Sequence, residues 1–139
     1  MNKIVRIPLF AASLLLMLAV GVSVVFAAPD PFVGGWESTD QDGSYQVLTI
    51  GGGPGNSYHV RYYDFGATIC GLDPVTGDFL HAASAQGVLT DSGSGPEGTL
   101  PVYCRTSPPT FWGNANFNYM YDSITDTLVD AHGIVWSRK

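Results

Sequence analysis

Short runs of alternating hydrophobic and polar residues follow one another from residue 35 to the end of the chain. A period of two is typical of β-strands that bury one face, and no stretch of useful length shows the 3.6-residue period of a helix. The clearest run is 111–122. Its predicted inward-facing residues are Ala115, Phe117, Tyr119 and Tyr121. The pattern predicts an all-β domain.

Clusters of Gly, Pro, Asp and Asn separate the runs and predict short turns. About 7–9 strands so closely spaced indicate an antiparallel meander, most simply a closed or nearly closed small barrel, because closure removes exposed edges. A two-sheet β-sandwich is the alternative. Pro101 predicts an edge or a bulge in its strand because it has no N–H to donate. The predicted strands are 35–39, 44–50, 58–65, 67–72, 79–89, 99–104, 111–122, 125–130 and 133–138.

Residues 1–27 have the pattern of a signal peptide. Lys3 and Arg6 precede a long apolar run, and small residues at its end predict cleavage after Ala27. An uncleaved membrane anchor is the alternative, since about 20 apolar residues can span a bilayer. The chain is therefore predicted to be secreted or periplasmic, with no membrane contact after cleavage.

The remaining chain is predicted to consist of a flexible lead, residues 28–33, and one β-barrel domain, residues 34–139. Without the two basic residues of the signal peptide, four Lys and Arg stand against twelve Asp and Glu, which gives a net charge of −8 with neutral histidines. So acidic a chain has no basic patch for nucleic acid, and it is repelled by an anionic membrane surface.

Two cysteines, Cys70 and Cys104, fall in the barrel domain. An even count in an exported chain predicts one disulfide. A thiolate metal site would require a second Cys or a His at short spacing, and neither cysteine has one. In the chain-entropy model, closing this loop stabilises the fold by about 3–4 kcal/mol.

The opening "GGWESTDQDGSYQVLTI" resembles the first hairpin of calycins, the lipocalin and avidin group, whose first strand begins Gly-x-Trp as Gly34 and Trp36 do here. Late in the chain Arg138 follows "GIVW", and in lipocalins a basic residue at this place packs over the opening Trp. The resemblance therefore implies a barrel with Trp36 and Arg138 paired at its base, held by a cation–π attraction. Small exported bacterial β-proteins also resemble the chain throughout.

Small periplasmic protease inhibitors with eight-stranded barrels and one disulfide are similar in size and opening motif. Such proteins act through a flexible N-terminal trunk, a role that the lead 28–33 would play here. This resemblance implies an alternative function as a protein-interaction module, such as an inhibitor of an extracellular hydrolase or protease.

The residues show no clear metal or catalytic motif. Asp40, Asp42 and Ser44 alternate like calcium ligands, but position 12 of such a loop is Gly51, so a hairpin turn at Asp-Gly is the better interpretation. No nucleophile motif of the G-x-S-x-G or S-x-x-K kind is present. Glu37 is the one acid that a hydrolase hypothesis would test first. The histidines, none of them spaced as a ligand pair, are His59, His81 and His132.

Aromatic residues gather on two predicted strands, 58–65 and 111–122. Inside a barrel they would either fill the core or line a pocket, because an eight-stranded barrel is just wide enough for either. Outside it, rings beside the Asn row of 114–118 would stack on sugars. The sequence thus predicts a non-enzymatic binding protein without cofactor, whose partner is a small apolar or sugar ligand or an extracellular protein. The candidate ligand contacts are Trp36, Tyr62, Trp112 and Tyr119.

Overall fold

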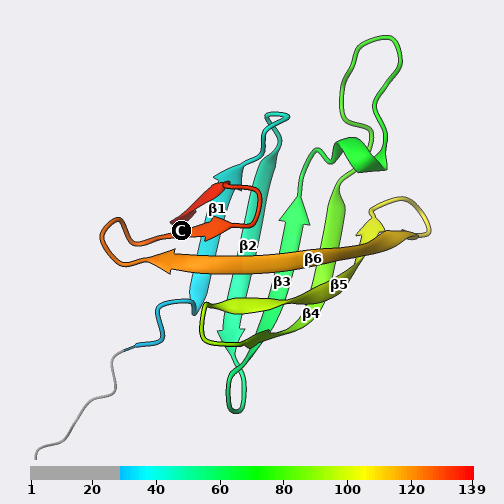
Figure 1. Cartoon of the computed structure of the whole chain (residues 1–139). Helices are drawn as coiled ribbons and strands as arrows, with labels where there is room; N and C mark the ends of the chain where they lie inside the picture. Colours follow the sequence, from blue (N-terminus) through cyan, green and yellow to red (C-terminus); the bar gives the residue numbers. More distant parts are fainter. Residues whose placement is uncertain (1–28) are drawn as a thin grey trace, which may run out of the picture.

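A computed structural model describes residues 29–139, and the predicted signal peptide lies outside the described residues. The chain forms a closed, antiparallel barrel of eight strands in sequential order (Figure 1). This confirms the predicted all-β meander and decides for the barrel against the sandwich. Within residues 29–139, the structure contains no helix with the length and apolar character needed to cross a bilayer.

Each strand pairs with the next, and the last pairs with the first. Closure is made by two register pairs, Trp36 with Arg138 and Glu37 with Ser137. The strands are β1 Gly34–Thr39, β2 Tyr45–Gly52, β3 Ser57–Asp64, β4 Ala83–Asp91, β5 Pro96–Cys104, β6 Thr110–Asp122, β7 Thr127–Asp130 and β8 Val135–Arg138.

The barrel has two different ends. We call one end the mouth; it carries the connections 40–44, 65–82, 105–109 and 131–134. The opposite end is the base, formed by the segment 29–33 and the connections 53–56, 92–95 and 123–126. In Figure 1 the mouth lies toward the upper right and the base toward the lower left.

The core follows the predicted alternation. On β2, Gln46, Leu48 and Ile50 are buried, while Tyr45 and Thr49 point outward and are exposed. Burial of such apolar faces is the main favourable term in folding. The fully buried large side chains include Trp36, Trp136, Tyr119, Leu48, Leu89 and Leu128.

Two predicted strands differ from the structure: the strand predicted over 79–89 begins only at Ala83, and the strand predicted over 67–72 does not form. Residues 67–72 were expected as a strand, but they form a single 3-10 turn, Thr68–Cys70, followed by an isolated bridge between Leu72 and Phe79. A run this short carries too little alternation to distinguish a strand from a turn. The segment 65–82 is thus one long connection at the mouth.

Pro101 lies in a strand paired on both sides, and a local irregularity accommodates it. The β4–β5 ladder is interrupted between the pair Ala85–Val102 and the pair Thr90–Glu97, and Pro101 falls in this interruption. A missing N–H is tolerated where no ladder bond is needed. The sequence predicted an edge or a bulge at Pro101; the structure instead has a gap in the β4–β5 ladder there.

The two cysteines form the predicted disulfide. Cys70 and Cys104 are joined with their Cα atoms 5.4 Å apart and 34 positions apart in the sequence. The bond ties the long mouth connection to the end of β5. Such a bond is compatible with an extracytoplasmic location.

Candidate functional site

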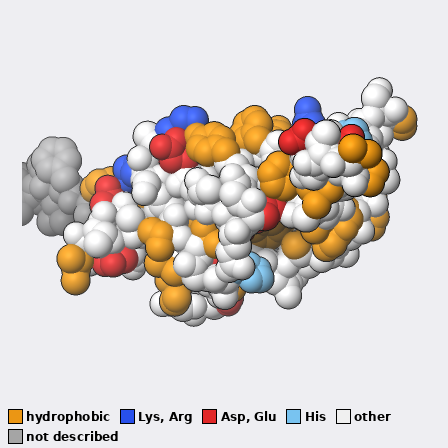
Figure 2. All heavy atoms as spheres, turned by 90° about the horizontal axis from the view of Figure 1, so that it is seen from above, with side chains coloured by type: hydrophobic (Ala, Val, Ile, Leu, Met, Phe, Trp, Pro, Cys, Tyr) orange, Lys and Arg blue, Asp and Glu red, His pale blue; other side chains and the backbone are white. Residues whose placement is uncertain are grey.

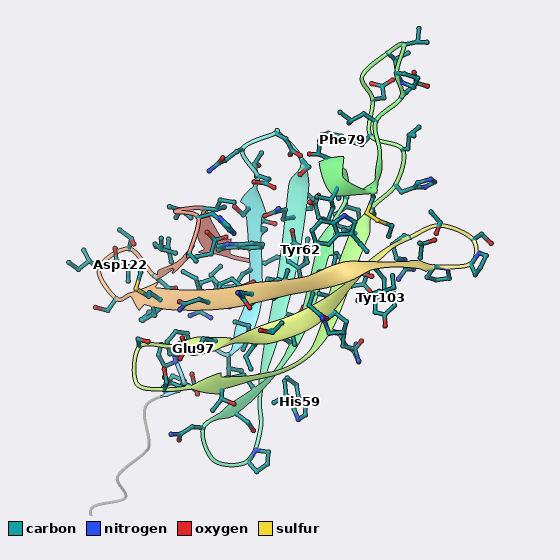
Figure 3. The ribbon with its side chains drawn as sticks, turned by 45° about the vertical axis from the view of Figure 1, so that its right-hand side comes forward. His59, Tyr62, Phe79, Glu97, Tyr103 and Asp122 are labelled. Carbon is teal, nitrogen blue, oxygen red and sulfur yellow. A yellow bond between two sulfur atoms is a disulfide. The ribbon has the colours of Figure 1, made fainter. Side chains whose placement is uncertain are left out.

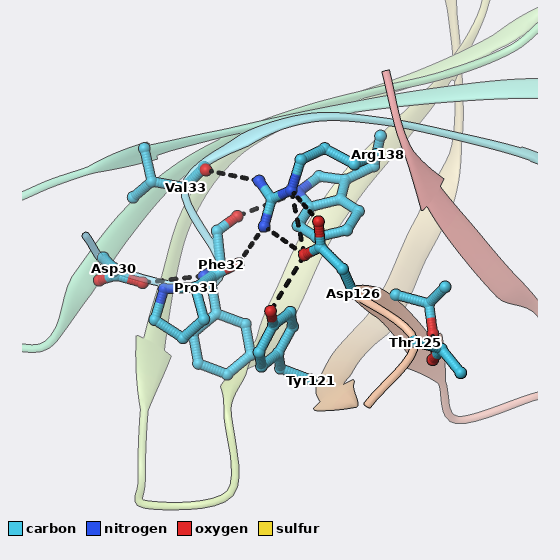
Figure 4. A network of polar contacts seen from close by, with 10 residues as sticks. Asp30, Pro31, Phe32, Val33, Tyr121, Thr125, Asp126 and Arg138 are labelled. Atoms are coloured by element: carbon cyan, nitrogen blue, oxygen red, sulfur yellow. Dashed lines mark hydrogen bonds and ion pairs between the residues drawn. The ribbon is translucent and has the colours of Figure 1, made fainter. Parts of the chain in front are cut away.

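A polar network around Arg138 closes the base of the barrel (Figure 4). The guanidinium carbon lies 4.1 Å from the centroid of the Trp36 ring. Arg138 also donates to both carboxylate oxygens of Asp126, at 2.9–3.1 Å, and to the carbonyls of Pro31 and Val33. The structure therefore places Arg138 over the first-strand Trp, in the arrangement that the lipocalin resemblance implied.

The segment 30–33 is held against the base. Phe32 inserts its ring edge-on beside Tyr58, with centroids 5.8 Å apart, and its carbonyl accepts a hydrogen bond from Trp36 Nε1 at 3.0 Å. Tyr58 donates to Asp30 at 2.8 Å, and burial together with this bond raises the pKa of Tyr58 to about 12. Of the lead predicted over 28–33, the structure describes residues 29–33 and holds Asp30 and Phe32 against the base through these contacts.

The ion pair at the base predicts a loss of stability in acid. Hydrogen bonds from Arg138, and then from Tyr121, hold the pKa of Asp126 below its usual value. A carboxyl with a lowered folded pKa stabilises the protein above the unfolded pKa, and this contribution disappears as the pH falls below about 4. We expect the free energy of unfolding, measured with urea between pH 5 and 3, to fall more steeply in the wild type than in Asp126→Asn.

Asp78→Asn is the matched control, because the Asp78 carboxylate accepts no hydrogen bond within residues 29–139. It should keep the wild-type slope. Equal slopes in the wild type and Asp126→Asn would show that the pair does not stabilise the base.

A cavity of about 340 Å³ occupies the mouth half of the barrel. Its floor is aromatic: Tyr62 lies 5.4 Å from Phe117 and 6.1 Å from Trp136, centroid to centroid. Figure 3 shows Tyr62 in the middle of the barrel, with Tyr103 and His59 away from it. The volume falls within the range of small-molecule sites, about 300–1,000 Å³. The barrel is thus filled at the base and hollow at the mouth.

Small side chains leave this space open. Ala83 and Ala115 line the cavity from β4 and β6, and Ala67 lines it from the mouth connection. They share the interior with the large rings of Tyr119 and Trp136. Since an alanine fills far less volume than the aromatic residues beside it, the interior cannot close to full packing density here.

Three of the four predicted ligand contacts line the cavity, namely Tyr62, Trp112 and Tyr119. The fourth, Trp36, is fully buried beneath Arg138 at the base, so it is not placed to touch a ligand there. The alternation of apolar residues along β1 predicts that Trp36 faces the interior, but it does not predict which end of the barrel Trp36 occupies.

Trp112 reaches the mouth because of a β-bulge. Val102 and Tyr103 of β5 pair with Gly113 and Phe111 of β6, which leaves Trp112 as the unpaired extra residue. The extra residue of a bulge breaks the regular alternation of the strand, so its side chain points in a different direction from the one alternation predicts. Trp112 lines the cavity with about half of its surface exposed.

Two polar side chains are buried beside the floor. Gln46 and Asp64 are direct cross-strand partners and are 3% and 5% exposed. Gln46 Nε2 donates to Tyr62 Oη at 2.9 Å, whereas Oε1 has no hydrogen-bond partner within residues 29–139. Asp64 Oδ1 accepts from the amide of Gly66 at 3.0 Å. A buried acceptor without a donor is costly, so this wall of the cavity is an incomplete polar surface.

Carboxylates surround the mouth of the cavity. Asp40, Asp42 and Asp130 line it together with Asp64. Asp130 accepts from the amides of His132 and Ile134 and from Trp136 Nε1. Burial alone would raise the pKa of Asp42, but hydrogen bonds from Thr68 and Ser44 outweigh it and hold that pKa below its usual value.

The two buried phenols carry raised pKa values. Burial is the main cause at Tyr62, followed by the charges of the aspartates, Asp64 first. At Tyr119 burial is again the main cause, followed by Tyr62 and Asp130. Both phenols are therefore neutral at ordinary pH and present hydroxyl groups and ring faces to the cavity.

Residues weighed for chemistry from the sequence lie apart from one another. Glu37 accepts a hydrogen bond from Tyr45 at 2.8 Å on the outer face and does not line the cavity. His132 lines the cavity, but His59 and His81 do not. Asp40, Asp42 and Ser44 form the predicted turn, with Gly43 at φ +89°. The described part of the chain brings no three His, Cys, Asp or Glu together as metal ligands.

Two amides of the outer Asn row are hydrogen-bonded to the neighbouring strand β5. Asn116 accepts from Thr99 at 2.7 Å, and Asn118 donates to Glu97 at 3.3 Å, so both amides are bonded to the neighbouring strand. Trp112, the ring predicted beside them, is turned to the mouth.

No protein-family model, curated protein or solved structure matches this chain. The likeness to calycins holds at the coarse level of a closed eight-stranded antiparallel barrel.

Proposed function

We propose that this chain is a secreted, calycin-like binding protein that holds one small ligand in the mouth cavity and performs no chemistry on it. The observation that carries the proposal is the asymmetry of the barrel. One end is sealed by Arg138 and the segment 30–33, while the other opens onto an aromatic cavity of about 340 Å³. Rigid walls around a partly apolar hollow are typical of small-molecule sites.

The contacts of the cavity residues support binding over catalysis. The buried phenols are kept neutral, and the carboxylates Asp42 and Asp130 are occupied by hydrogen bonds of their own turns. An acid–base pair would require two titratable groups with pKa values pushed apart and aimed at one substrate atom. Secretion is supported by the disulfide, which persists in oxidising compartments.

The test is titration with N-phenyl-1-naphthylamine, a neutral apolar dye whose fluorescence increases in an apolar site. We expect one dye per chain. Ala115→Phe should weaken this binding at least tenfold, because a ring at this position fills the cavity. Val88→Phe adds a ring on the outer face of β4 and should leave the affinity unchanged. Binding that both variants leave intact, or no binding to folded wild-type protein, would contradict the proposal.

A further inference from the structure

The charges of the barrel are unevenly distributed around the cavity. Four carboxylates line the mouth, and no Lys or Arg of residues 29–139 does. Arg138 and Lys139 lie at the base; Arg105 belongs to the mouth connection 105–109, but together with Arg61 it lines a separate hollow outside the cavity. Figure 2, which looks at the molecule from above the view of Figure 1, shows Lys and Arg only toward the edges of that face. The lining of the cavity thus carries negative charge that no Lys or Arg among the lining residues offsets.

Turn chemistry explains part of this charge. Asp42 and Asp130 accept backbone N–H groups of their own connections, as aspartates in turns commonly do. Neither is opposed by a cation, since the one ion pair within residues 29–139 is that of Arg138 with Asp126. The carboxylates alone would therefore not distinguish a binding site from a set of acidic turns.

Gln46 supplies the independent observation. Its side chain lines the cavity, is 3% exposed and leaves Oε1 without a hydrogen-bond donor among the described residues. Its cross-strand neighbour Asp64, also almost fully buried, receives one hydrogen bond, from Gly66. Two adjacent acceptors with spare capacity face the same cavity. Such acceptors favour a ligand that donates hydrogen bonds, and the carboxylate favours one that carries positive charge.

The aromatic floor suits the same ligand. Ring faces attract cations, and Tyr62, Phe117, Tyr119 and Trp136 are packed edge to face or tilted at centroid distances of 5.4–6.5 Å. The charges of the mouth aspartates reach this floor, because they add to burial in raising the pKa of Tyr62. An anionic ligand would be repelled by these carboxylates, since no Lys or Arg of residues 29–139 lines the cavity to offset the repulsion.

We propose that the mouth cavity selects a protonated amine carried on a single aromatic or apolar body. The ring of the ligand would pack against Tyr62 and Trp136, and its ammonium group would donate to Gln46 Oε1 and Asp64. This inference rests on the proposed ligand-binding function and adds the chemical class of the ligand to it.

Three compounds with one ring and different charge test the proposal by calorimetry at pH 7: tyramine, a cation; tyrosol, its neutral alcohol; and 4-hydroxyphenylacetate, an anion. We expect tyramine to bind at least tenfold more tightly than tyrosol, and the anion not measurably. Asp64→Asn should lower the affinity for tyramine at least tenfold and the affinity for tyrosol less than twofold. The Asn side chain keeps an acceptor for the amide of Gly66, so the local fold should persist.

Glu97→Gln is the matched control. It removes the same charge from an outward-facing residue near the start of β5, at the base and away from Tyr62 in Figure 3, and should leave all three affinities within twofold. If Asp64→Asn does not fold, Asp40→Asn at the rim replaces it, with a several-fold loss expected for tyramine alone. An equal loss in Glu97→Gln would show a nonspecific charge effect and overturn the proposal.

The failure of this inference is distinguishable from that of the binding function. Tyrosol binding as tightly as tyramine, or the anion binding more tightly, would overturn the selectivity and leave the cavity as a ligand site. Binding of N-phenyl-1-naphthylamine without any binding of tyramine would likewise overturn the selectivity for amines and leave the cavity as a ligand site. If neither the dye nor any of the three compounds binds folded protein, both proposals fail.

Discussion

Replacing both cysteines, Cys70→Ala with Cys104→Ala, is expected to lower the free energy of unfolding by about 3–4 kcal/mol. The disulfide closes a loop between positions 34 residues apart, and its removal returns that loop entropy to the unfolded chain. For a domain of this size the loss corresponds to a decrease in Tm on the order of 10–20 °C. Urea unfolding of the double variant and of the oxidised wild type measures the difference.

The same variant should also weaken ligand binding. Ala67, Thr68 and Ile69 line the cavity and come directly before Cys70, so the disulfide fixes one wall of the site to the end of β5. We expect the affinity for N-phenyl-1-naphthylamine to fall several-fold in protein that is still folded. Wild type kept under reducing conditions is the control for the substitutions themselves. A stability change below about 1 kcal/mol would mean that the loop is held by other contacts.

Trp36→Ala is expected to cost about 3–5 kcal/mol, the usual range for emptying a large buried aromatic site. The ring is fully buried, packs beneath the guanidinium of Arg138 and donates from Nε1 to the carbonyl of Phe32. Its loss removes core volume and leaves the base seal without its central element. Thermal and urea unfolding of the variant measure the effect.

Two comparisons separate packing from the other contributions of this residue. Trp36→Phe keeps most of the apolar ring and loses the hydrogen bond to Phe32, so it should be clearly milder than Trp36→Ala. A double-mutant cycle of Trp36→Phe with Arg138→Met measures the coupling across the 4.1 Å contact, expected at about 0.5–1 kcal/mol. A cost below about 1 kcal/mol for Trp36→Ala would contradict the role of the base as a packed seal.

Most of the fold could be predicted from alternation alone. Gln46, Leu48 and Ile50 face inward because apolar and buried positions recur every second residue in a strand, and the structure agrees at each of them. The short segment 67–72 was mispredicted because a few residues carry no usable period. The contacts of the segment 30–33 could not be predicted because they are not local. Phe32 packs against Tyr58 and Tyr121, both more than 20 residues away in the sequence.

The site was less accessible to prediction than the barrel. Tyr62 and Tyr119 could be found as inward-facing aromatics, but Trp112 reaches the mouth only through a bulge, which is a property of register. Asp64 and Asp130 fall near the ends of the predicted strands 58–65 and 125–130, and the sequence could not tell that they line a cavity, because burial on the inner side of a barrel mouth depends on which connections meet there. A Gln in an otherwise apolar inward row, Gln46, was the one local signal of a polar wall.

The three tryptophans provide the most direct measurement of the central claim, because Trp112 and Trp136 line the cavity and Trp36 lies at the sealed base. In a ¹⁵N-labelled sample, each indole N–H gives its own resonance, assigned by single Trp→Phe variants. Titration with N-phenyl-1-naphthylamine is predicted to shift the indole signals of Trp112 and Trp136 and to leave that of Trp36 in place. A shift confined to Trp36, or saturable binding that moves none of the three signals, would contradict a ligand site in the barrel mouth.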